Sequence, residues 1–176
     1  MVKQIFQQNI TIKGLKDQLL EQILNLKEKG SHQFLSHALD LIMPGPLFYG
    51  LRVSKLGKKN VEVVIPLSGE KKPSESAIVE AALLANRLIT GRQFTEGQPT
   101  LLTKSLHLNM VAKTKSEVRL RGEFTEVLRE DLFLDLSRKN SAELSNKFQC
   151  FDLDQKLIAE IDLVTTVKYQ NIKKLT

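Results

Sequence analysis

The sequence predicts an α+β protein in which an antiparallel sheet packs against one long helix, and three patterns carry that prediction. Residues 101–123 alternate apolar and polar side chains on both sides of a short break, which is typical of half-buried strands. Residues 148–169 form a second β-rich run, interrupted by residues that favour a turn. Residues 74–89 instead repeat apolar side chains at helical spacing. The sheet is therefore expected to have one apolar face and one wet face.

Two early strands are expected at 47–56 and 61–67. The four residues between them, 57–60, offer Gly and Asn for the backbone angles of a tight turn. A polar loop at 68–73 then leads into the helix.

The helix is expected to begin at Ser74, a good N-cap, and to stop at residues 90–92. Asn86 lies almost opposite its apolar stripe, so it is expected in solvent or at an interface. The stripe consists of Ala77, Ile78, Ala81, Ala82, Leu84, Ala85, Leu88 and Ile89.

The strand at 101–113 departs from strict alternation only at Lys104. The residues expected on its inner face are Leu102, Leu106, Leu108, Met110 and Ala112, and those on its outer face are Thr103, Ser105, His107, Asn109 and Lys113. The pattern restarts at Val118 after a break at 113–116, so the two strands are expected to form a hairpin. An outer-face position argues against a catalytic role for His107.

Residues 125–140 fit either a strand or a helix, because Leu132, Leu134 and Leu136 alternate. A Thr125 cap and a basic, Asn-ended last turn favour the helix. Its acid pair, Glu130 and Asp131, is then a solvated face.

The second hairpin is expected to turn at 152–155. Cys150 lies on the apolar strand before it and is interpreted as a buried structural residue, because no histidine is near it in sequence.

The N-terminal 45 residues contain two expected helices, at 12–29 and from Ser31 to before Pro44. They could form a DNA-reading pair or cover one edge of the sheet. The second interpretation is favoured because it needs only the apolar stripes. His32 and His37 are expected to be surface or cap residues rather than metal ligands.

Composition indicates one globular domain, since the chain has 176 residues of which 41% are hydrophobic. The expected division is a helical extension at 1–45, the sheet domain at 46–170 and a tail at 171–176. No apolar run approaches the roughly 18 residues of a membrane span and no signal-peptide core is seen, so a cytoplasmic protein is expected. The net charge of +6 is scattered over turns without interleaved aromatic residues, which argues against a nucleic-acid partner.

Two segments resemble the hotdog family, in which a curved antiparallel sheet wraps around one long central helix. Residues 106–113 are similar to its pattern of alternating apolar residues with an Asn and a basic end. Residues 152–160 resemble its closing hairpin, with Gln155 where Gly is usual. The likeness covers 48–169 and is strongest to thioesterase-like members with added N-terminal helices and an inserted helix.

The resemblance implies a cofactor-free and metal-free site at a dimer interface, near the start of the central helix. There, backbone N–H groups polarise a thioester carbonyl while a carboxylate acts as base or nucleophile. The family signature is an Asn in the loop, His-Gly-Gly at the helix start and an acid two turns along. This chain departs from it, because residues 73–77 replace the glycines and Leu83 replaces the acid.

The candidate site residues carried by this reasoning have ordinary structural alternatives. Glu80 is the candidate base, although an ion pair with Arg87 or a lysine would also explain it. Two lysines of the 113–116 break are candidates for coenzyme A phosphates, although solvated turns commonly contain lysine. The candidate substrate-binding residues are Ser74, Ser76, Ala77, Lys113 and Lys115, of which the two serines could equally be capping residues.

Three functions follow from these residues. The first is hydrolysis of an acyl-CoA thioester by a homodimer or tetramer. The second is a non-catalytic hotdog module that binds an acyl ligand or a protein partner, which the departures from the signature favour. The third, a dehydratase, needs a histidine before or on the helix, and neither the loop nor the helix has one.

Overall fold

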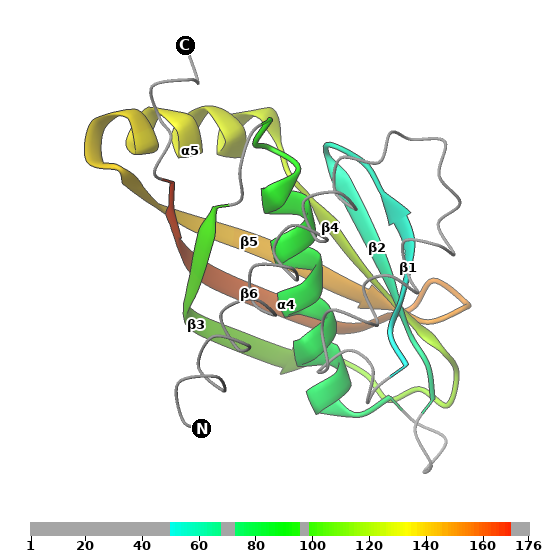
Figure 1. Cartoon of the computed structure of the whole chain (residues 1–176). Helices are drawn as coiled ribbons and strands as arrows, with labels where there is room; N and C mark the ends of the chain where they lie inside the picture. Colours follow the sequence, from blue (N-terminus) through cyan, green and yellow to red (C-terminus); the bar gives the residue numbers. More distant parts are fainter. Residues whose placement is uncertain (1–49, 68–72, 96–98, 170–176) are drawn as a thin grey trace, which may run out of the picture.

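The structure is a computed structural model that describes residues 50–67, 73–95 and 99–169. The helices expected within 1–45 and the tail at 171–176 lie outside the described residues. The elements, labelled as in Figure 1, are β1 (Arg52–Leu56), β2 (Asn60–Ile65), α4 (Glu75–Gly91), β3 (Thr100–Met110), β4 (Val118–Glu123), α5 (Glu126–Lys139), β5 (Ser141–Phe151) and β6 (Leu157–Lys168).

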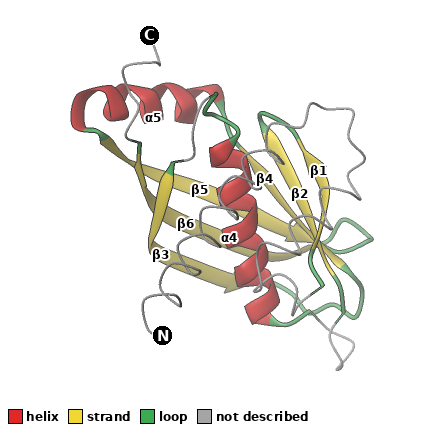
Figure 2. Ribbon diagram, in the orientation of Figure 1, coloured by secondary structure: helices red, strands yellow, loops and turns green. Residues whose placement is uncertain are grey.

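The strands form one antiparallel sheet of six strands in the order β1-β2-β4-β5-β6-β3. The sheet curves, and α4 lies in its concave side (Figure 2). The hairpins predicted around 57–60 and 152–155 are confirmed as β1-β2 and β5-β6. The predicted α+β hotdog arrangement of a curved sheet around a central helix is thus what the structure shows.

The predicted pairing of the strands at 101–113 and 118–124 is wrong. β3 pairs with β6 at one edge, whereas β4 lies between β2 and β5. After β3 the chain stays on β6, because the backbone N–H groups of Val111 and Ala112 both donate to the Ile158 carbonyl, at 2.9 and 3.1 Å. The break at 113–116 is consequently a crossing between distant strands and not a hairpin turn.

Lys104 is the extra residue of a β-bulge between Thr103 and Ser105. The bulge reverses the alternation, so Leu101 and Thr103 lie opposite the buried Val167 and Thr165. Leu102, predicted to face inward, is instead 49% exposed.

Beyond the bulge the predicted faces are correct at Leu106 and Leu108, which are half-buried opposite Leu163 and Ile161. Met110, also predicted inward, is 40% exposed at the end of the strand.

The central helix has the predicted start and the predicted apolar face. The Ser74 hydroxyl accepts a hydrogen bond from the Ala77 amide at 3.1 Å. Every residue of the expected stripe is buried, and α4 packs against β2, β4 and β5.

Asn86 is not solvated as expected but is 3% exposed. Its amide nitrogen donates to the Thr165 hydroxyl at 3.1 Å, and its amide oxygen accepts from Asn146 at 2.6 Å. At 100° per residue, Asn86 is about 60° around the helix from Ile89. A curved sheet covers a wider arc of the helix than a flat one, and that arc includes Asn86.

The ambiguous segment is the helix α5, as favoured above. Thr125 caps it by accepting from the Leu128 amide at 3.3 Å, and Asn140 ends it with a left-handed φ of 56°. Leu132 and Leu136 are buried against β5, and the predicted acid pair, Glu130 and Asp131, is exposed.

Gln155 has φ of 61°, a conformation that suits Gly, and its side-chain oxygen accepts a hydrogen bond from Arg121 at 2.8 Å.

Cys150 is fully buried on β5, as predicted, and burial raises the pKa of its thiol to about 12.

Gly122 on β4 lies directly across from Phe148 on β5. A methyl group at Gly122 would come within 2.4 Å of the Phe148 ring, which is 1% exposed and cannot move outward without disturbing the core. We therefore expect Gly122→Ala to lower the free energy of unfolding by about 1 to 3 kcal/mol, measured by chemical denaturation. Ser145→Ala on an exposed β5 position is the control, with an expected change of about 0.5 kcal/mol or less. Equal effects of the two substitutions would contradict this packing.

Candidate functional site

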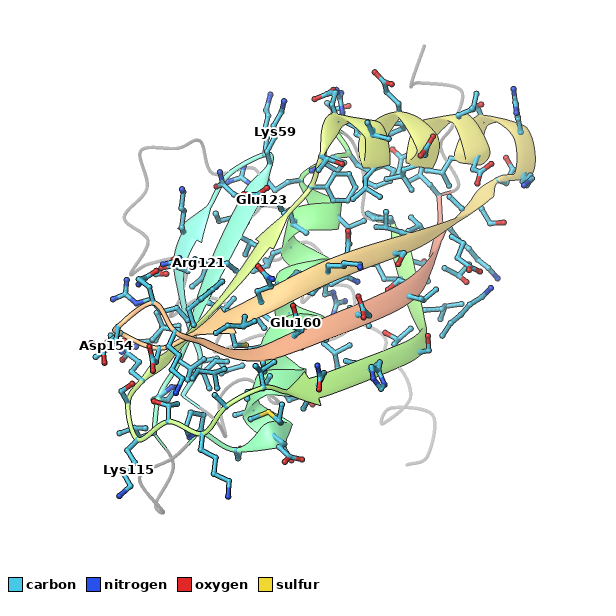
Figure 3. The ribbon with its side chains drawn as sticks, turned by 180° about the vertical axis from the view of Figure 1, so that it is seen from behind. Lys59, Lys115, Arg121, Glu123, Asp154 and Glu160 are labelled. Carbon is cyan, nitrogen blue, oxygen red and sulfur yellow. The ribbon has the colours of Figure 1, made fainter. Side chains whose placement is uncertain are left out.

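An open pocket of about 880 Å³ lies at the start of α4. Three segments far apart in the sequence form it. They are residues 73–75 at the helix start, residues 110–115 at and beyond the end of β3, and Ile158 on β6. In Figure 3 Lys115 projects from the loop after β3, at the periphery of the molecule.

Hydrogen bonds hold the loop after β3 against β6. The two amides after β3 that donate to the Ile158 carbonyl keep the chain at the edge of the sheet. The Thr114 hydroxyl accepts from the Ser116 amide at 3.1 Å, a turn that side-chain hydroxyls commonly stabilise. The loop after β3 is thereby fixed at the edge of the sheet, where it lines the pocket together with the helix start.

The first turn of α4 offers backbone donors. Helix geometry leaves the amides of the first turn without an intrahelical acceptor. The Ala77 amide is used by Ser74, while those of Glu75 and Ser76 have no acceptor among the described residues. These donors and the positive end of the helix dipole favour an anion or a polarised carbonyl oxygen nearby.

The two pocket lysines are exposed and form no ion pair with a described residue. Lys113 and Lys115 are therefore available to an anionic ligand. Three other lining residues, Met110, Val111 and Ile158, form an apolar part of the wall. The pocket thus combines cations and an apolar surface at the start of a helix.

The structure brings together three of the predicted site residues, because Ser74, Lys113 and Lys115 all line the pocket. Ser76 is exposed and Ala77 is buried, and neither is among the lining residues.

Glu80 is half-buried on α4 and does not line the pocket within the described part of the chain. It has no hydrogen bond or ion pair there, so the alternative pairing with Arg87 is not seen. Six residues separate it from Asn86, which places the two side chains about 120° apart around the helix. Asn86 faces β5 and β6, so Glu80 faces away from those strands.

Sequence reasoning missed Glu75, which lines the pocket from the first helical position. An acid there is an ordinary partner of the helix dipole, so its type alone gave no signal. It also missed Ile158, which reaches the pocket only because β6 pairs with β3.

The described residues contain neither a cluster of metal-binding side chains nor a membrane-spanning helix. They contain no group of three or more metal-binding side chains. Neither of their helices is long and apolar enough to span a bilayer.

No protein-family model and no curated protein sequence matches the chain. Solved structures do match. A protein of unknown function from Pseudomonas aeruginosa, described as a probable thioesterase, has a TM-score of 0.70 and 17% identity over 78% of this chain and 95% of that chain. The chain has the hotdog fold.

Two other hotdog matches agree. A protein of unknown function from Chlorobaculum tepidum has a TM-score of 0.66 and 12% identity, covering 79% of this chain and 94% of that chain. A thioesterase from Haemophilus influenzae has a TM-score of 0.61 and 14% identity, covering 83% of this chain and 94% of that chain. At such identities the likeness shows the fold, while the roles of individual site residues stay predictions.

The two serines at the start of α4 should differ in their effect on stability. Ser74 caps the helix, whereas Ser76 is exposed and makes no hydrogen bond with its side chain among the described residues. We expect Ser74→Ala to cost about 1 kcal/mol of unfolding free energy and Ser76→Ala about 0.5 kcal/mol or less, by chemical denaturation. A larger effect at Ser76 would show that the helix starts elsewhere.

Proposed function

We propose that the protein binds an acyl-CoA or a related acyl thioester in the pocket at the start of α4 and hydrolyses it. The observation that carries the proposal is the convergence of Ser74, Lys113 and Lys115 on one pocket at the start of α4, where the amides of Glu75 and Ser76 have no acceptor among the described residues. The thioesterase descriptions of two structural neighbours support the same ligand class.

Each part of the pocket suits one part of such a ligand. The two lysines are point charges for the phosphates of coenzyme A. The apolar wall suits an acyl chain or the pantetheine arm. The amide of Glu75, which lines the pocket, and that of Ser76 beside it suit the thioester oxygen, which becomes more negative as the reaction proceeds.

The proposed reaction is addition of water to the thioester carbonyl followed by loss of the thiol. A carboxylate takes a proton from water while the water oxygen bonds to the carbonyl carbon. The helix-start amides stabilise the resulting oxyanion. The carbon–sulfur bond then breaks, the thiolate takes up the proton, and a carboxylic acid and a thiol leave. Glu80 is the base proposed from the sequence, and Glu75 is a second candidate because it lines the pocket.

A non-catalytic binding module is the second candidate function. It is favoured by Leu83, a half-buried apolar residue where the family resemblance places the acid. The same pocket would then hold an acyl ligand without hydrolysing it.

We also propose that the protein is at least a homodimer, with a second copy on the free edge of β3. β3 pairs only with β6 among the described strands, so one row of its backbone groups is unpaired there. Leu106 and Leu108 of β3 and Leu83 of α4 are also only partly buried in the single chain. A second copy would cover them and satisfy the strand edge. A cytoplasmic location stays a prediction of the sequence.

The dimer prediction is tested by light scattering. We expect a dimer or tetramer at micromolar concentration, because the strand edge and the partly buried leucines need a partner. Leu83→Glu should shift the population toward monomer, whereas Lys55→Glu, on the edge strand at the opposite side of the sheet, should not. A monomeric wild-type protein would contradict the proposal.

The functional prediction uses thiol release from short, long and aromatic acyl-CoAs. If a carboxylate is the base, Glu75→Gln or Glu80→Gln should lower hydrolysis by about 10²-fold or more. Lys113→Ala with Lys115→Ala should mainly raise KM, because phosphate contacts far from the carbonyl bind ground and transition states alike.

The matched control is Lys55→Ala with Lys58→Ala, which removes the same charge from exposed positions near the β1-β2 turn. Its kinetics should resemble those of the wild type. Thermal stabilisation by a CoA ester without hydrolysis would favour the binding module. If the protein shows no hydrolysis and no stabilisation with any of these CoA esters, both functions are overturned.

A further inference from the structure

Four polar residues interrupt the apolar core beneath α4. Asn86, Thr90, Asn146 and Thr165 are 3%, 0%, 2% and 0% exposed. Asn86 is the centre of the group, because its amide donates to Thr165 on β6 and accepts from Asn146 on β5. One side chain of the helix thus bonds to two neighbouring strands of the sheet.

The other buried contacts of α4 define its position less sharply. Four of the eight stripe residues are alanines, namely Ala77, Ala81, Ala82 and Ala85. Small side chains let the helix approach the sheet closely, but they protrude little and resist sliding or rotation weakly. Apolar contacts are also non-directional, and cores tolerate repacking of residues of similar volume.

The two hydrogen bonds of Asn86 are directional and buried, so they break if the helix rotates or slides. A slide by one turn would place Ala82 or Thr90 where Asn86 now lies, and Ala82 can form neither bond. The buried groups of Asn146 and Thr165 would then lack partners, which is unfavourable in a core. The Asn146 side-chain oxygen already makes no hydrogen bond among the described residues, so this cluster has little capacity to compensate.

We infer that Asn86 is a positioning residue, which fixes the rotation and the longitudinal position of α4 on the sheet and thereby places the helix start against residues 110–115. Twelve residues separate Asn86 from Ser74, which corresponds to about 18 Å along the helix. Asn86 therefore acts on the pocket through the helix and does not touch a ligand there. The consequence for ligand binding rests on the proposed function, whereas the consequence for the helix does not.

The first test follows the backbone amides of Ser76 and Ala77 by ¹H–¹⁵N NMR of the full chain. In Asn86→Leu, which keeps the volume but removes both hydrogen bonds, these resonances should shift or double. Thr165→Val removes one bond and should cause a smaller change. Leu88→Ala is the matched control, because it opens a cavity on the same helix without touching the polar cluster, and it should leave both resonances in place.

The outcomes separate the possibilities. Unchanged Ser76 and Ala77 resonances in Asn86→Leu would overturn the inference, as would equal shifts in Leu88→Ala. Where Asn86→Leu does not fold, Thr165→Val decides by the same two resonances.

The second test measures binding of acetyl-CoA by calorimetry. If the wild type binds it, Asn86→Leu should weaken binding by about tenfold or more, while Leu88→Ala should not. If the wild type does not bind acetyl-CoA or any longer acyl-CoA, the proposed function fails, and the NMR result alone decides the role of Asn86.

Discussion

The simultaneous pairing of β6 with β5 and β3 is the constraint on which the rest of the structure depends. β5 and β6 are long strands joined by a tight turn, and β3 adds to them along almost its whole length. Long twisted strands paired in this way curve, and the curvature makes room for a helix on the concave side. The same pairing brings the chain that follows β3 alongside the first residues of β6. The loop with both pocket lysines consequently arrives at the start of α4.

Much of this fold could be predicted, because local patterns determine local structure. The cap at Ser74, the stripe of α4 and the turn at 152–155 each depend on residues close together in the chain. Alternation, however, reports which face of a strand is buried and not which strand is its neighbour, so β3 was paired with the wrong partner. The bulge was visible only as one misplaced residue, Lys104.

The candidate site could likewise be predicted only in part. Ser74 and the two lysines could be proposed because caps and basic turns are recognisable in sequence. Ile158 could not, since it depends on a strand pairing across the fold. The prediction that Asn86 lies in solvent was wrong because a helical projection treats the sheet as flat. A curved sheet buries a wider arc of the helix. The roles of Glu75 and Glu80 depend on where a ligand carbonyl lies, which local sequence does not specify.

The bulge at Lys104 also limits what could pair with the edge of β3 that has no neighbour among the described strands. The extra residue interrupts the regular spacing of backbone donors and acceptors, so a strand that pairs with residues 100–110 must change register at Lys104, as β6 does. An incoming strand can follow the segment before the bulge or the one after it, at different registers. Edge strands without such an interruption are templates for open-ended aggregation. The bulge therefore disfavours the open-ended stacking of unrelated β-strands on this edge.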